Sequence, residues 1–139
     1  MAMAKPSQDK RLGQHFLSDL NILNAIAEAA DVSEADTVVE IGPGAGSLTQ
    51  VLARRAARVV AIEMDHELVS FLEPRVPQNV EIRHADARRV AVEELVGSDT
   101  SYKLLGNLPY YAALPILRTF LEHPHRPTRA AILVQKEVA

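Results

Sequence analysis

The chain has 139 residues, of which 47% are hydrophobic and 24% charged, a composition typical of a single globular domain with its own core. Because it contains no cysteine, disulfide bonds, thiolate metal sites and a cysteine nucleophile are excluded. Its net charge of −3 argues against binding of nucleic acid by the charge of the whole domain, so such binding would need local basic patches.

The first stretch, residues 1–18, lacks the charged-then-apolar pattern of a signal peptide, and no apolar run in the chain reaches the length of a membrane span. We therefore expect a cytoplasmic protein with no membrane partner. By spacing alone, the segment 14–17 is a surface lead-in to a helix. That helix is predicted over residues 19–30, where apolar side chains recur every three or four positions and Ser18 or Asp19 can cap the start.

The next segment combines a strand, a glycine turn and a helix. Residues 38–41 form a short run of strand formers, which is followed by glycines at positions 42, 44 and 46 and by a helical pattern from Ser47. This unit lets a backbone approach a nucleotide-like ligand at the start of a helix. A dinucleotide fold has glycine at the first, third and sixth positions, and here Ser47 occupies the sixth, so S-adenosylmethionine fits as well as a dinucleotide.

Glu63 stands twenty-one residues after Gly42, at the end of a second apolar run. An acid in this place can accept hydrogen bonds from both hydroxyls of a ribose, which supports a nucleoside ligand. A tight strand-to-helix turn without any ligand is the alternative that the pattern leaves open.

Strands and helices alternate through the rest of the chain. Further strands are predicted at residues 58–63, 80–84, 103–107 and 129–135. Helices are predicted around 68–72, around 90–95 and over 113–122, the last with Pro115 in its first turn and with Leu114, Leu117 and Leu121 on one apolar side. Such alternation predicts an α/β fold with a parallel sheet in the order 3-2-1-4-5, helices on both faces and the residues 80–84 at one edge. Ligands bind beyond the carboxyl ends of the strands, where Gly42, Glu63, Asp86 and Asn107 are all expected.

The segment Asn107-Leu108-Pro109-Tyr110 indicates the substrate. The amine of adenine is a poor nucleophile because its lone pair is delocalised into the ring. The amide oxygen of Asn107 and the carbonyl of Leu108, whose backbone Pro109 restricts, could accept its two N–H bonds and localise the lone pair. Tyr110 offers a ring on which an extruded base can stack. A turn with proline and buried aromatic residues is the alternative.

These motifs resemble the ribosomal RNA adenine N6,N6-dimethyltransferase family, and most of all its bacterial members that act on 16S rRNA. The resemblance runs from Lys10 to the last residue. The segments that carry it are Gln14-His15-Phe16-Leu17, Glu40-Ile41-Gly42-Pro43-Gly44-Ala45-Gly46, Glu63-Met64-Asp65, Asp86-Ala87, Asn107-Leu108-Pro109-Tyr110-Tyr111 and Gln135-Lys136-Glu137-Val138. It implies a Rossmann-like class I methyltransferase fold.

The resemblance also implies a role for each site residue. His15 and Leu17 would line the methionine end of S-adenosylmethionine, which replaces the reading of residues 14–17 as a lead-in. Gly42, Gly44 and their neighbours would wrap its tail, Glu63 would hold the ribose, and Asp86 would bind the adenine amine. Asn107 would contact both the donor and the target.

The implied reaction is dimethylation of two adjacent adenines in 16S rRNA, with the small ribosomal subunit precursor as partner, a role in ribosome biogenesis and no metal. Family members continue beyond the last motif, so residues 1–139 are expected to be the donor-binding domain of a longer enzyme, without its last strands and its helical C-terminal domain. The strand at 129–134 would then have an open edge and could mediate self-association.

Three alternative functions remain at this point. One is dimethylation of 23S rRNA, of the kind that gives macrolide resistance. Another is a non-catalytic ribosome-assembly module that binds rRNA. The third, a nicotinamide dehydrogenase, is disfavoured by the glycine spacing.

Overall fold

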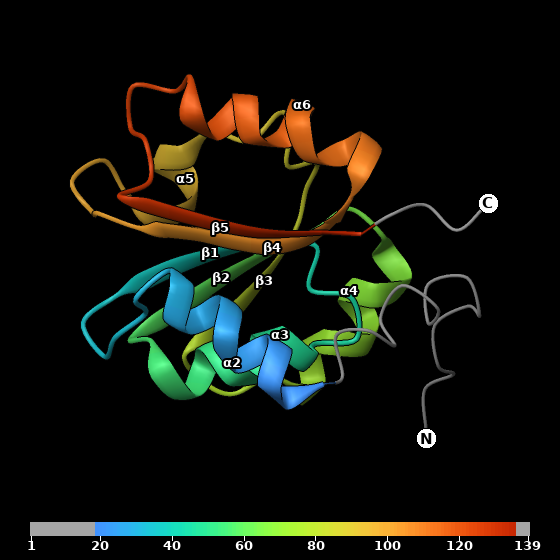
Figure 1. Cartoon of the computed structure of the whole chain (residues 1–139). Helices are drawn as coiled ribbons and strands as arrows, with labels where there is room; N and C mark the ends of the chain where they lie inside the picture. Colours follow the sequence, from blue (N-terminus) through green and yellow to red (C-terminus); the bar gives the residue numbers. More distant parts are fainter. Residues whose placement is uncertain (1–18, 136–139) are drawn as a thin grey trace.

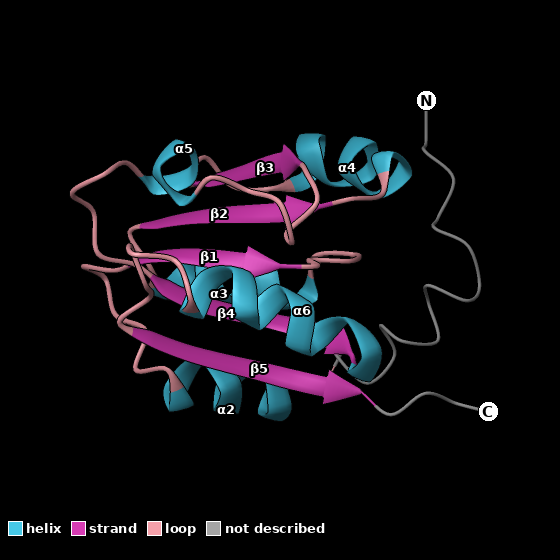
Figure 2. Cartoon of the chain, turned by 90° about the horizontal axis from the view of Figure 1, so that it is seen from above, coloured by secondary structure: helices cyan, strands magenta, loops and turns pink. Residues whose placement is uncertain are grey.

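The computed structural model of the chain describes residues 19–135, and within this range five parallel strands form one sheet (Figure 2). The strands are β1 (Thr37–Ile41), β2 (Arg58–Glu63), β3 (Val80–His84), β4 (Lys103–Pro109) and β5 (Arg129–Gln135). Their order is β3-β2-β1-β4-β5, which confirms the predicted order and places β3 at one edge. All four strand pairings are parallel.

Helices cover both faces of the sheet, as Figure 1 shows. The elements α2 (Leu20–Ala29), α3 (Ser47–Arg55) and α4 (His66–Leu72) lie on one face, and α4 continues into a 3₁₀ turn at Glu73–Arg75. On the other face lie α5 (Val92–Val96) and α6 (Tyr110–Leu121). None of the described helices is long and apolar enough to cross a membrane.

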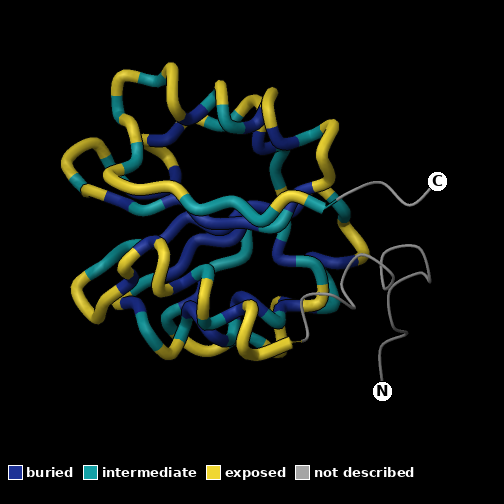
Figure 3. The backbone as a smooth tube through the Cα atoms, viewed as in Figure 1, coloured by how far each residue is buried: buried dark blue, intermediate teal, exposed yellow. Residues whose placement is uncertain are grey.

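The core has two layers because side chains alternate along each strand. Val38 packs in the layer under α2 and α3, whereas its neighbour Val39 packs in the layer under α5 and α6. The central strands are buried on both sides, as Figure 3 shows. Each fully buried Val, Leu or Ile contributes about 1.5–3 kcal/mol, so the central strands form a rigid platform for the loops at their ends.

Helix α2 begins at Leu20 because Asp19 caps it: the Asp19 side chain accepts a hydrogen bond of 2.9 Å from the backbone N–H of Asn21. Asp65 caps α4 in the same way through the backbone N–H of Glu67, at 2.9 Å. Of the two predicted caps, Ser18 and Asp19, the structure shows Asp19.

Helix α6 differs from its prediction in where it begins. It begins at Tyr110, so Pro115 is its sixth residue and lies in the second turn, whereas we predicted the first turn. Its buried side carries Ala113, Ile116 and Phe120. Leu114 is 66% exposed and Leu121 46% exposed. The predicted apolar side with Leu114 and Leu121 exists, but a second apolar side of α6 faces the sheet, and periodicity alone does not say which of two apolar sides does so.

The edge of the sheet where the strands begin, which we call the amino edge, is closed by paired polar groups. Lys103 at the start of β4 donates from Nζ to Asp36 Oδ2 at 2.9 Å and to the carbonyl of Asp31 at 2.6 Å. Tyr102 is fully buried, and its hydroxyl donates to the carbonyl of His125 at 2.9 Å. These contacts fasten the loops before β1 and β5 to β4.

Candidate functional site

At the opposite edge, where the strands end, the glycine turn after β1 adopts a conformation that side chains disfavour. Gly42, Gly44 and Gly46 all have positive φ, at 69°, 58° and 93°. A Cβ on Gly46 would also lie 2.8 Å from Leu72 Cδ2. The turn runs into α3, whose start has no side-chain cap. A backbone-lined surface at the start of a helix is therefore available at this carboxyl edge.

Two acidic residues lie behind this turn. Glu40 in β1 is 1% exposed, and its Oε1 accepts a hydrogen bond from Thr49 Oγ1 at 2.5 Å. Burial raises the pKa of Glu40 to about 8, the bond from Thr49 opposes that rise, and the charge of Glu63 adds to it. Glu40 is therefore mostly uncharged at neutral pH.

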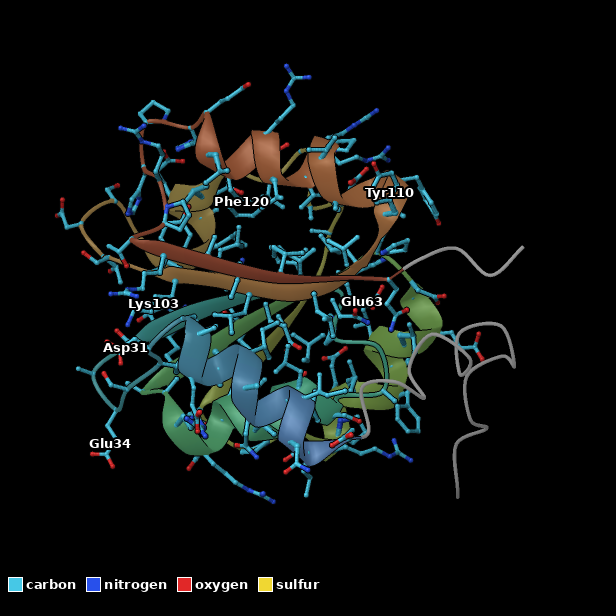
Figure 4. All side chains as sticks on the ribbon, in the orientation of Figure 1. Asp31, Glu34, Glu63, Lys103, Tyr110 and Phe120 are labelled. Carbon is cyan, nitrogen blue, oxygen red and sulfur yellow. The ribbon has the colours of Figure 1, made fainter. Side chains whose placement is uncertain are left out.

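Glu63 ends β2 and is 9% exposed. Its Oε2 accepts the backbone N–H of Asp65 at 2.9 Å, which fixes the carboxylate beside the turn that leads into α4. Figure 4 shows Glu63 and Tyr110 toward the same end of the sheet, with Lys103 and Asp31 toward the other. The structure thus places the acid where the sequence predicted it, at the carboxyl end of the second strand.

Asp86 follows β3 and is held by Arg88. Its carboxylate accepts hydrogen bonds from Arg88 Nε at 3.0 Å, from Arg88 Nη2 at 2.8 Å and from the backbone N–H of Arg88 at 3.0 Å. The guanidinium bonds and that N–H lower the pKa of Asp86 to about 2, so the carboxylate stays charged. Asp86 and Arg89 also line an open cavity of about 300 Å³ between the end of β3 and α5.

Asn107 lies near the end of β4, where β4 runs between β1 and β5. Its side-chain Oδ1 is buried and has no hydrogen-bond partner in the described range 19–135. The backbone carbonyl of Asn107 lies 3.3 Å from the position that a Cβ on Gly42 would take, so the catalytic candidate and the glycine turn are adjacent. A buried amide oxygen without a partner is costly, and a ligand N–H would relieve that cost.

The residues after Asn107 point in different directions. Leu108 is buried in the layer under α6, Pro109 is exposed, and Tyr110 is 69% exposed at the first position of α6. Tyr110 thus presents its ring to solvent at the carboxyl edge. This is the arrangement that stacking on an incoming base requires.

Sequence reasoning missed three residues of this region. Thr49 interrupts the apolar side of α3, which is the signal that could have shown it to have a buried partner. Arg88 gave no such signal. Gly106 lies where β4 approaches β1 so closely that a Cβ would meet the carbonyl oxygen of Ile41 at 2.7 Å.

His15 and Leu17 lie outside the described residues, as do residues 136–138 of the last motif. Within residues 19–135, the structure brings together at one edge the glycine turn, Glu63, Asp86 and Asn107. No cluster of His, Asp and Glu suited to a metal ion occurs in this range. The arrangement offers backbone N–H groups, an acid for hydroxyls and two acceptors for amines.

Comparison with known proteins gives consistent matches. A family model described as ribosomal RNA adenine dimethylase matches residues 6–139. Ribosomal RNA small subunit methyltransferase A of Dehalococcoides mccartyi (strain CBDB1) is 45% identical over 132 residues, which cover 94% of this chain and 45% of that protein. The protein of the same name from Clostridium perfringens (strain SM101 / Type A) is 44% identical over 94% of this chain and 46% of its own length. The chain therefore spans less than half the length of these curated relatives.

Solved structures agree on the fold. The crystal structure of the 23S rRNA methyltransferase ErmE matches with a TM-score of 0.67 and 28% identity, over 84% of this chain and 46% of that one. A dimethyladenosine transferase from Plasmodium falciparum matches with a TM-score of 0.70 and 27% identity, over 85% of this chain and 42% of that one. The fold is the Rossmann-like fold of S-adenosylmethionine-dependent methyltransferases, as the sequence predicted.

Proposed function

Since the chain belongs to the ribosomal RNA adenine dimethylase family, we propose that it takes part in the S-adenosylmethionine-dependent dimethylation of two adjacent adenines of 16S rRNA. The small-subunit target is supported by 45% identity to the small-subunit methyltransferase of Dehalococcoides mccartyi and 44% identity to that of Clostridium perfringens. The partner is then a precursor of the small ribosomal subunit, and the compartment is the cytoplasm. Residues 1–139 serve as the donor-binding domain.

In this proposal the carboxyl edge holds the donor. The turn at Gly42 and Gly44 follows its tail with backbone atoms, and Glu63 accepts the ribose hydroxyls. His15 and Leu17 line the methionine end by analogy with the family. When bound, S-adenosylmethionine supplies an electrophilic methyl group on its sulfonium and leaves as S-adenosylhomocysteine.

The observation that carries the proposal is the buried Oδ1 of Asn107, which lacks a hydrogen-bond partner within the described part of the chain. This oxygen accepts one N–H of the target amine, and the carbonyl of Leu108 accepts the other. With both N–H bonds held, the nitrogen lone pair is directed at the methyl carbon. The N–C bond would form as the C–S bond breaks, and the product nitrogen would release its proton to water afterwards, so no strong base is needed at the start. Tyr110 holds the extruded base by its ring, and Pro109 keeps the Leu108 backbone extended.

The test is transfer of labelled methyl groups from S-adenosylmethionine. We expect the label in small ribosomal subunits that lack these methyl groups, at the two adjacent adenines. Label in 23S rRNA fragments instead would favour the 23S alternative. Binding of S-adenosylhomocysteine and of rRNA without any transfer, even in a version extended to the length of the relatives, would favour a non-catalytic assembly module.

A second partner is proposed at the outer edge of β5. In the described range this strand pairs only with β4, and Val134 is 45% exposed. The outward N–H and C=O groups of residues 129–134 can pair with the same strand of another copy. Light scattering at increasing concentration tests this: we expect association that a charged substitution, Val134→Lys, weakens. A monomer at all concentrations would exclude it.

A further inference from the structure

The hydrogen bonds from Arg88 to Asp86 limit what else this carboxylate can bind. An ionised carboxylate offers about four acceptor positions. Oδ1 already accepts two hydrogen bonds from Arg88, from the backbone N–H and from Nε, and Oδ2 accepts one, from Nη2. One acceptor position stays open, on Oδ2. The Asp86 side chain is 25% exposed, so a ligand can reach it.

Arg88 is itself fixed from a second element. Its backbone carbonyl accepts a hydrogen bond from Thr119 Oγ1 of α6 at 3.0 Å. The backbone N–H of Arg89 donates to the carbonyl of Asp86 at 2.9 Å and closes the turn. The fold therefore holds the backbone of Arg88, while its side chain, which is 51% exposed, is held by its bonds to Asp86.

The charge of the pair matters as well. A neutral base that covers a lone carboxylate leaves a charge without a partner, which is costly. The guanidinium of Arg88 compensates the charge of Asp86, while the carboxylate remains an acceptor because its pKa is held at about 2. The pair thus presents a single oriented acceptor with little net charge, which suits the N–H of a neutral amine.

We propose that Arg88 is a positioning residue for recognition of the adenine of the donor: it orients Asp86 so that one carboxylate position accepts the exocyclic amine and rejects a carbonyl in its place. This inference rests on the proposed function, because it requires an adenosine-containing donor at the carboxyl edge. A base with a carbonyl at that position would bring two acceptors together, so the pair selects adenine over hypoxanthine.

The experiment compares the affinities of the chain for S-adenosylhomocysteine and S-inosylhomocysteine by calorimetry. We expect the chain to prefer the adenine ligand, and Arg88→Met to lower that preference about tenfold, since an oriented, charge-assisted acceptor is lost. Arg54→Met is the control: it removes an exposed cation near the end of α3 that makes no hydrogen bond to the Asp86 carboxylate, and its preference should stay within about twofold. Arg88→Lys keeps the charge without the planar fork and should also lose preference.

The ratio of the two affinities separates positioning from a general structural role, which would weaken both ligands equally. An unchanged ratio in Arg88→Met overturns the inference. So does tighter binding of S-adenosylhomocysteine, because Arg88 would then compete for Asp86. Thermal melting checks that each variant folds. If Arg88→Met does not fold, Arg88→Lys is the variant whose affinity ratio is compared with that of the wild type. If the chain binds S-adenosylhomocysteine without preference, donor binding stands and the role of Arg88 fails; if it binds neither ligand, both fail.

Discussion

The two edges of the sheet satisfy their polar groups in opposite ways. At the amino edge, Lys103 bonds to Asp36 and to the carbonyl of Asp31, and Tyr102 bonds to the carbonyl of His125. One exception is Nδ1 of His125, which is buried without a partner in residues 19–135, although Nε2 of the same ring bonds to Thr100 O at 2.7 Å.

At the carboxyl edge two polar groups are buried at a cost. Glu40 is buried with a raised pKa, and the amide oxygen of Asn107 is unpaired within the described residues. The comparison indicates that one edge stabilises the fold, whereas the other keeps binding groups free at a cost in stability. Substitutions at the two edges should therefore have opposite effects.

The largest effect is expected from Asn107→Ala. The variant loses the acceptor that localises the lone pair of the target amine, so methyl transfer to small-subunit rRNA should fall by about 100-fold or more. Stability should not fall, because the oxygen has no hydrogen bond to lose in the described chain and its burial without a partner is itself costly. Single-turnover assays measure the rate of methyl transfer, and urea unfolding measures the stability. Near-normal transfer would contradict the role of Asn107.

Glu40→Gln should raise stability at neutral and alkaline pH. The pKa of Glu40 is raised in the folded state from 4.5 to about 8, so the folded chain keeps a proton that the unfolded chain releases as pH rises. The wild type should lose stability between pH 4.5 and about 8, on the order of 5 kcal/mol in total. The glutamine keeps an oxygen for Thr49 and removes this dependence. Urea unfolding across that pH range measures the free energy of unfolding of both proteins. If this free energy varied with pH in the same way in the variant and the wild type, the raised pKa of Glu40 would be refuted.

Glu63→Ala should weaken binding of S-adenosylhomocysteine about tenfold or more, because a carboxylate that accepts two hydroxyls contributes about 1.5–3 kcal/mol. Calorimetry on the chain measures this. Glu67→Ala is a suitable control, since Glu67 is an exposed acid in the next helix. Equal affinity of Glu63→Ala and the wild type would remove Glu63 from the site.

At the amino edge, Lys103→Met should lower the free energy of unfolding by about 1–2 kcal/mol, because Asp36 and the carbonyl of Asp31 lose their donor. Burial alone would raise the pKa of Asp36, but bonds from Lys103 and Ser33 outweigh burial and lower it. This stabilisation is present above the unfolded pKa of about 4 and is lost as pH falls through the lower folded pKa. Urea unfolding at pH 7 and pH 3 measures the free energy of unfolding of both proteins. The difference between variant and wild type should be smaller at pH 3 than at pH 7. Donor affinity should not change, and a large loss of it would break the contrast between the edges.

The alternation of strand and helix patterns was enough to predict the sheet order and to place Gly42, Glu63, Asp86 and Asn107 at one edge. The phase of α6 could not be predicted, because Leu114 and Phe120 are both apolar and only packing selects one side.

The hydrogen-bond partners of side chains could not be predicted from the sequence, for a different reason. The bonds of Thr49 to Glu40 and of Arg88 to Asp86 depend on rotamers and loop geometry, which spacing does not encode. Nor could a motif reveal that the Asn107 oxygen lacks a partner in residues 19–135, since that depends on everything packed around it.

Gly106 sets how far apart the two halves of the site lie. Its Cα faces the carbonyl of Ile41, and the residues that follow these two positions are Asn107 and Gly42. Replacing a strand glycine by alanine usually stabilises a protein, because it lowers the conformational entropy of the unfolded chain. At position 106, however, the added methyl would lie 2.7 Å from that oxygen and force β4 away from β1. In a scan of all single substitutions, Gly106 should thus tolerate as little change as a residue of the binding site itself.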